Sequence, residues 1–159
     1  MKKITKVILG ILVLLILAVF VFAKVNRISH LSWGPPQVNQ SMFSNEAING
    51  YDAVAYFNEN QAVAGNEKFS YQWKNAHWKF SSEENLQLFK SNPERYTPEF
   101  GGYCAFAVSK GFTANIDPEV FGIVDNKLYL FDNEGVKSDW EADLAGNLAR
   151  CNSNWNQVH

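Results

Sequence analysis

Cysteine is scarce in this chain of 159 residues, and its two cysteines, Cys104 and Cys151, lie far apart. Neither belongs to a Cys-x-x-Cys pair, so the chain is not a disulfide-rich scaffold. Stability must instead come from a hydrophobic core. The aromatic content of 14%, with twelve Phe, six Tyr and five Trp, supplies large side chains for such a core.

Positive charge is scarce beyond the N-terminus. Four of the 14 Lys and Arg residues lie in residues 1–24, which contain no acid, so the rest of the chain carries ten basic side chains against 16 acidic ones. Its formal charge of about −6 would repel nucleic acid, and we expect no nucleic-acid partner. The sequence also lacks a phosphate loop, a dinucleotide fingerprint and a Gly-x-Ser-x-Gly elbow, so no motif supports a kinase, dehydrogenase or hydrolase.

The one long apolar run extends from Val7 to Ala23, after Lys2, Lys3 and Lys6. A helix over this run spans roughly 26 Å, close to the roughly 30 Å hydrocarbon core of a bilayer. Residues 1–25 are therefore interpreted either as an uncleaved signal anchor or as a signal peptide that is removed. The lysines before the run favour an N-terminus inside the cell. We expect a single-pass protein of the cytoplasmic membrane with its domain in the periplasm, or a secreted domain if the signal is cleaved.

Residues 26–44 are predicted to be a linker, because Gly34-Pro35-Pro36 blocks regular structure and polar residues follow it. Trp33 and Phe43 lie in this segment. Their side chains are predicted to pack either on the membrane interface or on the domain.

Residues 45–159 are predicted to form one α+β domain, with a small antiparallel sheet flanked by helices. Residues 52–57 have the composition of a short strand, and residues 69–73 and 77–80 fit a hairpin around the turn at 74–76. Ser81 and Glu84 fit a capping box that starts a helix ending at Asn92-Pro93.

The C-terminal part of the domain has a similar mixture. Asp117-Pro118 indicates a turn or a short helix. Residues 122–124 and 127–131 are predicted to be strands joined by the turn pair Asp125-Asn126. Residues 138–154 have helical periodicity, with Ser138 and Glu141 as a second capping box.

Several segments together resemble the YHS-domain family, in an exported or membrane-anchored subgroup. They are, in chain order, Gly50-Tyr51-Asp52-Ala53-Val54-Ala55-Tyr56-Phe57, Trp78-Lys79-Phe80-Ser81-Ser82-Glu83-Glu84-Asn85-Leu86, Pro93-Glu94-Arg95-Tyr96-Thr97-Pro98, Gly101-Gly102-Tyr103-Cys104-Ala105, Leu128-Tyr129-Leu130-Phe131 and Asn154-Trp155. The resemblance covers about residues 48 to 156 and implies a YHS-like core.

The resemblance also implies metal binding, notably of copper or other heavy metals, in members that carry cysteines. Those members have one cysteine in the opening segment and two that flank the strand-to-helix turn. The matching positions in this chain are Ala55, Ser81 and Asn85, none of which is a thiol. The chain therefore departs from the ligand set that the family uses for soft metals.

Cys104 is the remaining candidate for metal chemistry, because it follows a diglycine that lets the backbone approach a ligand closely. A thiol here could bind Cu(I) or Zn(II), or react directly. Two other interpretations are open: a small buried core residue, and a disulfide with Cys151 in an oxidising compartment.

His77 and Asp52 are the other candidate metal ligands. The competing interpretations are a packed or surface histidine, and an aspartate that caps a turn through its side chain.

Three functional hypotheses follow. The first is a membrane-tethered module that binds copper or zinc through Cys104, with His77 and Asp52. The second is a structural or protein-interaction module without metal, and the third is a thiol-based redox protein.

Overall fold

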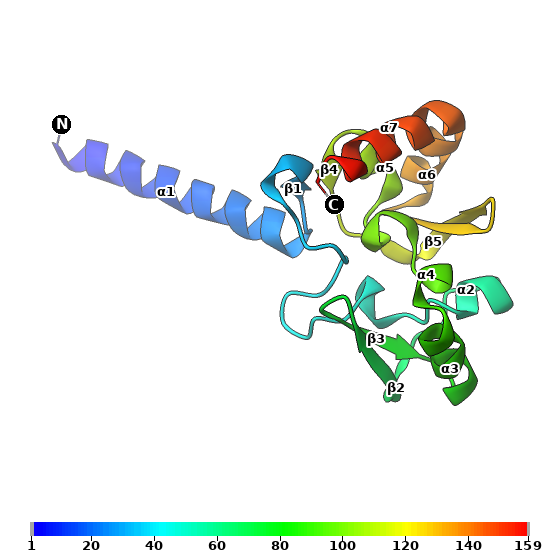
Figure 1. Ribbon diagram of the computed structural model, residues 1–159. Coiled ribbons are helices and arrows are strands. Elements are labelled where there is room, and N and C mark those ends of the chain that lie inside the picture. Colours follow the sequence, from blue (N-terminus) through cyan, green and yellow to red (C-terminus); the bar gives the residue numbers. More distant parts are fainter. Residues whose placement is uncertain (1, 159) are drawn as a thin grey trace.

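The computed structural model describes residues 2–158, with side chains from residue 4 onward. The long helix α1 (Lys2–Val25) extends away from the other elements, which gather beyond its C-terminal end (Figure 1). The remaining helices are α2 (Ala55–Asn58), α3 (Glu83–Ser91), α4 (Pro93–Tyr96), α5 (Ala105–Ser109), α6 (Glu134–Glu141) and α7 (Leu144–Asn156). The strands are β1 (Ser29–His30), β2 (Asn66–Trp73), β3 (Ala76–Phe80), β4 (Phe112–Thr113), β5 (Asp117–Val124) and β6 (Lys127–Phe131). The predicted α+β class, with an apolar N-terminal helix, is confirmed.

Helix α1 is long and apolar enough to cross a membrane. Its span Ile4–Val25 has 22 residues with a mean hydropathy of 3.0, and none of it is buried against the rest of the chain. A core helix of a soluble protein would bury part of this surface. The helix is therefore compatible with a membrane anchor or a signal sequence, as predicted.

The strands form three antiparallel pairs, β1 with β4, β2 with β3 and β5 with β6, and not one continuous sheet. Both predicted hairpins are confirmed. Their turns place Lys74 and Asn75, and Asp125 and Asn126, at positive φ. Two successive residues at positive φ give a turn whose twist matches that of paired strands, and Asn and Asp tolerate this conformation.

Two hydrophobic clusters form the core. One lies between the β2–β3 hairpin, α3 and the segment around residue 50, and the other lies between α5, α6, α7 and β6 (Figure 1). Aromatic rings dominate both, as the composition predicts. The largest fully buried aromatic side chains are Tyr56, Trp78, Phe80 and Phe89 in the first cluster, and Phe131 and Trp140 in the second.

The strand predicted over residues 52–57 is wrong. Tyr51 alone forms a bridge, with Ala64, and the chain then turns into α2. The reason is local, because the Asp52 carboxylate accepts hydrogen bonds from the backbone N–H groups of Val54 and Ala55. Such bonds favour a helix start over an extended chain.

Helix starts also differ from the prediction. Ser82, not Ser81, caps α3, and its side chain accepts from the Asn85 N–H at 3.1 Å. The single helix predicted near the C-terminus is divided into α6 and α7, which Asn133 and Asp143 cap. The turn or short helix predicted at Asp117 is instead the start of β5.

The segment predicted to be a linker packs on the domain. Leu31 and Val38 are buried, and Asn39 is fully buried. The Asn39 backbone N–H donates to the Gly101 carbonyl at 2.8 Å, and its side-chain amide donates to the Gly102 carbonyl at 2.9 Å. Burial and long-range hydrogen bonds hold residues 26–44 to the fold.

The end of α1 is tied to the same fold. The Asn26 carbonyl accepts from the Asn115 N–H at 2.9 Å, and the Arg27 carbonyl accepts from the Thr113 hydroxyl at 2.8 Å. β1 then pairs with β4. Only three residues separate the last residue of α1 from β1, so the helix joins the domain without a flexible spacer.

Gly101 allows the close approach of this segment, because it has a φ of 64° and a Cβ there would collide with the Gln37 carbonyl. We expect Gly101→Ala to lower the free energy of unfolding by about 2–4 kcal/mol, since a backbone contact must open in addition to the left-handed strain. Denaturant unfolding of the full chain in detergent, followed by tryptophan fluorescence, measures this.

The matched control is Gly111→Ala. Gly111 also has a positive φ, of 87°, but nothing lies within 4 Å of an added Cβ. Its substitution should cost only the conformational strain, about 1–2 kcal/mol. Equal losses in the two variants would contradict a steric role for Gly101.

Candidate functional site

Asp52 is fully buried and is the centre of a hydrogen-bond cluster. One carboxylate oxygen, Oδ1, accepts from the backbone N–H groups of Val54 at 2.8 Å and Ala55 at 3.3 Å. These bonds hold the turn into α2. The capping role that the sequence indicated for Asp52 is therefore present.

The other oxygen, Oδ2, joins Asp52 to the start of α3. It accepts from the Ser81 N–H, the Ser81 hydroxyl and the Asn85 side-chain amide, each at 2.7 Å. Asn85 also donates to the Ser81 hydroxyl at 3.2 Å. Ser81 is thus engaged by Asp52, which explains why the neighbouring Ser82 caps the helix.

The cluster unites the three positions that the sequence resemblance matches to ligand cysteines. Ala55, Ser81 and Asn85 come from two segments of the chain, and each donates at least one hydrogen bond to the Asp52 carboxylate. All five of its hydrogen bonds come from neutral donors. A buried carboxylate is stable only when such bonds replace water, and bonds to an ionised group are the stronger kind.

This cluster does not fit a soft metal ion. Copper(I) and zinc prefer thiolate and imidazole ligands, whereas these positions supply a methyl group, a hydroxyl and an amide. Both Asp52 oxygens are already occupied by donors. Within the described part of the chain, no group of three or more His, Cys, Asp or Glu residues is placed to hold a metal ion.

Cys104 lies elsewhere, at the start of α5, with only 2% of its surface exposed. Its backbone N–H donates to the Ala114 carbonyl at 3.1 Å, and its backbone bridges to Leu130 in β6. Burial raises the pKa of the Cys104 thiol, although backbone N–H groups such as that of Ala107 oppose the shift. The thiolate needed for metal binding or nucleophilic attack is therefore disfavoured.

The two glycines that precede Cys104 allow close packing within the chain. Gly101 lies against the backbone at Gln37, and a Cβ on Gly102 would collide with the Ile48 side chain. The close approach that the sequence suggested is made by other parts of this chain.

Cys104 and Cys151 are both free and buried, so the disulfide considered from the sequence is not formed. The Cys151 thiol donates to the Ala105 carbonyl at 3.1 Å. Burial raises the pKa of Cys151 to about 12. Neither thiol has the lowered pKa that a redox protein requires.

His77 lies in β3 at the edge of a surface charge cluster. Its Nε2 atom is 3.5 Å from the Glu67 carboxylate, and Lys79 in the same strand contacts both Glu67 and Glu46. The hydrogen bond from Lys79 lowers the pKa of the Glu46 carboxyl. The three predicted ligands Cys104, His77 and Asp52 therefore have separate partners and do not form one site.

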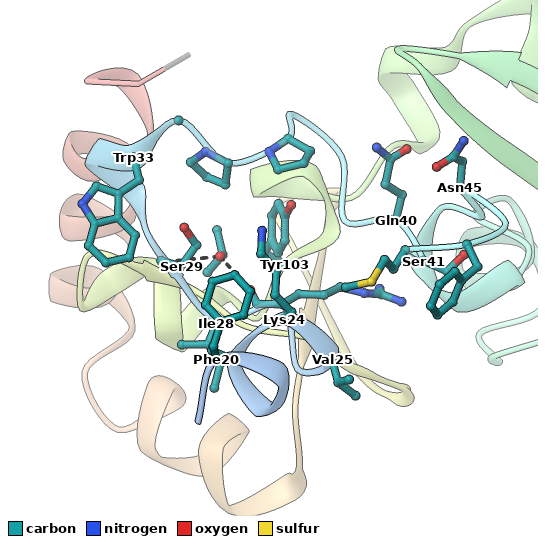
Figure 2. A pocket seen from close by; sticks show the side chains of 18 residues that line it. Phe20, Lys24, Val25, Ile28, Ser29, Trp33, Gln40, Ser41, Asn45 and Tyr103 are labelled. Atoms are coloured by element: carbon teal, nitrogen blue, oxygen red, sulfur yellow. Dashed lines mark hydrogen bonds between the residues drawn. The ribbon is translucent and has the colours of Figure 1, made fainter. Parts of the chain in front are cut away.

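A cavity that the sequence did not reveal lies where α1 meets the domain. Its volume is about 680 Å³. Figure 2 shows Trp33 on one side, Gln40 and Asn45 on the opposite side, and Tyr103 between them. The walls come from the last turns of α1, the segment from Arg27 to Asn45, and two residues of the domain, Tyr103 and Thr113.

The only sequence signal for this cavity was the pair of aromatic residues in the expected linker. Trp33 is 79% exposed and Phe43 is 96% exposed. Both line the cavity, so they lie beside the end of α1 and outside the core.

No family model, no curated protein and no solved structure matches the chain. Functional inference therefore rests on the residues and their geometry.

We predict that Asp52→Asn lowers the free energy of unfolding by about 2–4 kcal/mol, because an NH₂ group would replace an acceptor oxygen among buried donors. Denaturant unfolding of the full chain measures the loss.

Asp117→Asn is the matched control, because Asp117 is exposed and its Oδ1 accepts only the Glu119 N–H, at 3.0 Å, two positions later, as Asp52 accepts from Val54. It should cost less than about 1 kcal/mol. A loss for Asp52→Asn as small as the control loss would show that the cluster is not held by the carboxylate.

Proposed function

We propose that this chain is a membrane-anchored protein whose YHS-like domain lies outside the cytoplasm and acts as a non-enzymatic interaction module. The observation that carries the proposal is the Asp52 cluster. The three positions where the resemblance implies metal-binding thiols instead donate hydrogen bonds to the buried carboxylate of Asp52, which holds two segments together. The polar groups that could have formed a reactive centre are satisfied by one another.

The residues outside the cluster support the same proposal. Metal binding through Cys104 would require a reachable thiolate with further ligands beside it, but this thiol is buried and burial raises its pKa. The redox alternative requires the same thiolate. A module that acts through its surface requires neither.

The anchoring part of the proposal rests on α1 and on charge. None of the span Ile4–Val25 is buried against the rest of the chain, and three lysines precede its apolar run. Cationic residues are retained on the cytoplasmic side of a membrane, so this end belongs inside. The acidic domain then lies outside.

Protease accessibility tests the orientation. We expect a protease added to spheroplasts to remove a C-terminal epitope of the full chain, while the same epitope is protected in inside-out vesicles. The intact mass of the purified protein distinguishes an anchor from a signal peptide removed near Ala23. Protection in spheroplasts together with cleavage in inside-out vesicles would reverse the proposed topology.

Metal analysis tests the interaction-module assignment. We expect the full chain, purified from its native membrane without chelators, to hold less than about a tenth of an equivalent of copper or zinc. Cys104→Ala should leave this content unchanged, as should the control Cys151→Ala, which removes another buried thiol. A stoichiometric metal that Cys104→Ala alone removes would favour the metal-binding hypothesis instead.

A further inference from the structure

The cavity at the end of α1 is lined by two different kinds of surface. Phe20, Val25 and Ile28 supply apolar walls at the helix end, and the exposed Trp33, Met42 and Phe43 continue them. Hydroxyl and amide groups supply the polar part, from Ser29, Gln40, Ser41, Asn45, Tyr103 and Thr113. A ligand with one apolar and one polar end would match both surfaces.

All charged side chains that line the cavity are cationic. Lys24 and Arg27 are its two cations, and none of the 18 lining residues is acidic. Neither cation forms an ion pair with an Asp or Glu side chain in the part of the chain that the structure describes. An anionic ligand would supply the missing counter-charge.

Arg27 makes one side-chain hydrogen bond and has further N–H donors available. Its Nη1 atom donates to the Asn39 side-chain oxygen at 2.6 Å, and a guanidinium has five N–H donors in all. Burial lowers the pKa of Arg27, which reflects the lack of compensation for a partly buried cation. A phosphate oxygen would accept the donors that Asn39 leaves unused.

Gln40 adds a second unsatisfied group. Its side-chain oxygen is buried and has no hydrogen-bond partner. Gln40 lines the cavity, across from Trp33 (Figure 2). A ligand hydroxyl in the cavity could donate to this oxygen.

The position of the cavity restricts its source of ligand. Its walls include Phe20, Ala23, Lys24 and Val25, in the last turns of the span that is apolar enough to cross a bilayer. The end of such a span lies at the level of the lipid head groups, where Trp and basic side chains are favoured. A volume of about 680 Å³ is within the range of small-molecule sites and would hold a head group with the start of its acyl chains.

From these observations we propose that the cavity binds the head group of an anionic glycerophospholipid, with Lys24 and Arg27 at the phosphate and the acyl chains along Phe20. Gln40 accepts a hydrogen bond from a hydroxyl of the head group. This inference rests on the proposed membrane anchoring. With this site the module recognises anionic lipid at the outer surface of the membrane that anchors it.

Native mass spectrometry of the full chain released from nanodiscs tests the proposal. The nanodiscs contain either phosphatidylcholine alone or a mixture with phosphatidylglycerol. We expect one phosphatidylglycerol to be retained, at least about fivefold more often than phosphatidylcholine at equal abundance. Equal retention of the two lipids would overturn the proposal.

Charge variants locate the binding. Lys24→Gln and Arg27→Gln should each reduce phosphatidylglycerol retention by about fivefold or more. Lys68→Gln removes an exposed cation that does not line the cavity, and it should leave retention unchanged. An equal reduction in all three variants would mean that general surface charge attracts the lipid, and the cavity site would be rejected.

A second readout uses the native chain, and its only variant is a conservative change at the exposed Trp33. Phosphatidylglycerol brominated near its head group should quench a fluorescence component of the native chain that Trp33→Phe removes. Glycerol phosphate and inorganic phosphate, added at the same concentration, should not compete. Competition by either would identify a free phosphate site and reject a lipid, while dimers that exclude lipid would identify a second copy of the chain as the occupant.

The two proposals can fail separately. A cytoplasmic domain in the protease experiment would reject the proposed function, yet lipid retention could still be measured in nanodiscs. Loss of the segment before residue 24 in the intact mass would remove one wall of the cavity and reject both the lipid site and the membrane anchor, and only the interaction-module part of the proposed function would remain.

Discussion

The buried carboxylate of Asp52 is the constraint on which the first half of the domain depends. It is fully excluded from solvent and accepts hydrogen bonds from residues 29 and 33 positions later in the chain. Each of these donors offsets part of the cost of burying the carboxyl group. The turn into α2 and the start of α3 therefore stabilise each other, because a defect in either leaves acceptor oxygens of Asp52 unpaired. This mutual dependence makes the cluster a structural device and leaves little capacity for an external ligand.

A second set of long-range bonds does the same for the half of the domain next to α1. Asn39 is the central residue, because its side chain contacts Arg27 on one side and the Gly102 carbonyl on the other. Gly101 permits this approach by having no side chain. The segment between helix and domain is thereby ordered, and its order creates the cavity between them. The hydrogen bond from Arg27 to Asn39 holds the guanidinium in a partly buried position, where an anionic ligand would replace the lost water.

The sequence predicted what depends on neighbouring residues. Both hairpins were correctly placed, because Asp125-Asn126 and the turn after Trp73 have residues that tolerate positive φ. The apolar helix was equally clear. Ser81 shows where such reasoning ends, because it fits a helix cap as well as Ser82 does and only the distant Asp52 decides between them. Composition likewise indicated a linker where Asn39 is buried, since the carbonyls that accept its hydrogen bonds, at Gly101 and Gly102, lie more than 60 positions later. The separation of Cys104, His77 and Asp52 could not be predicted, because each belongs to a different packing environment.

The short junction after α1 determines how far the domain can act. A flexible linker would let a tethered domain sweep a wide volume, with a range that grows with the square root of its length. Here the chain passes from Val25 to paired β1 with only three residues between them. With α1 as the membrane anchor proposed above, this short junction would hold the domain in the layer next to the bilayer. Under that proposal the domain would reach lipids and the membrane-proximal parts of other proteins, and partners deeper in the surrounding compartment would be beyond its range.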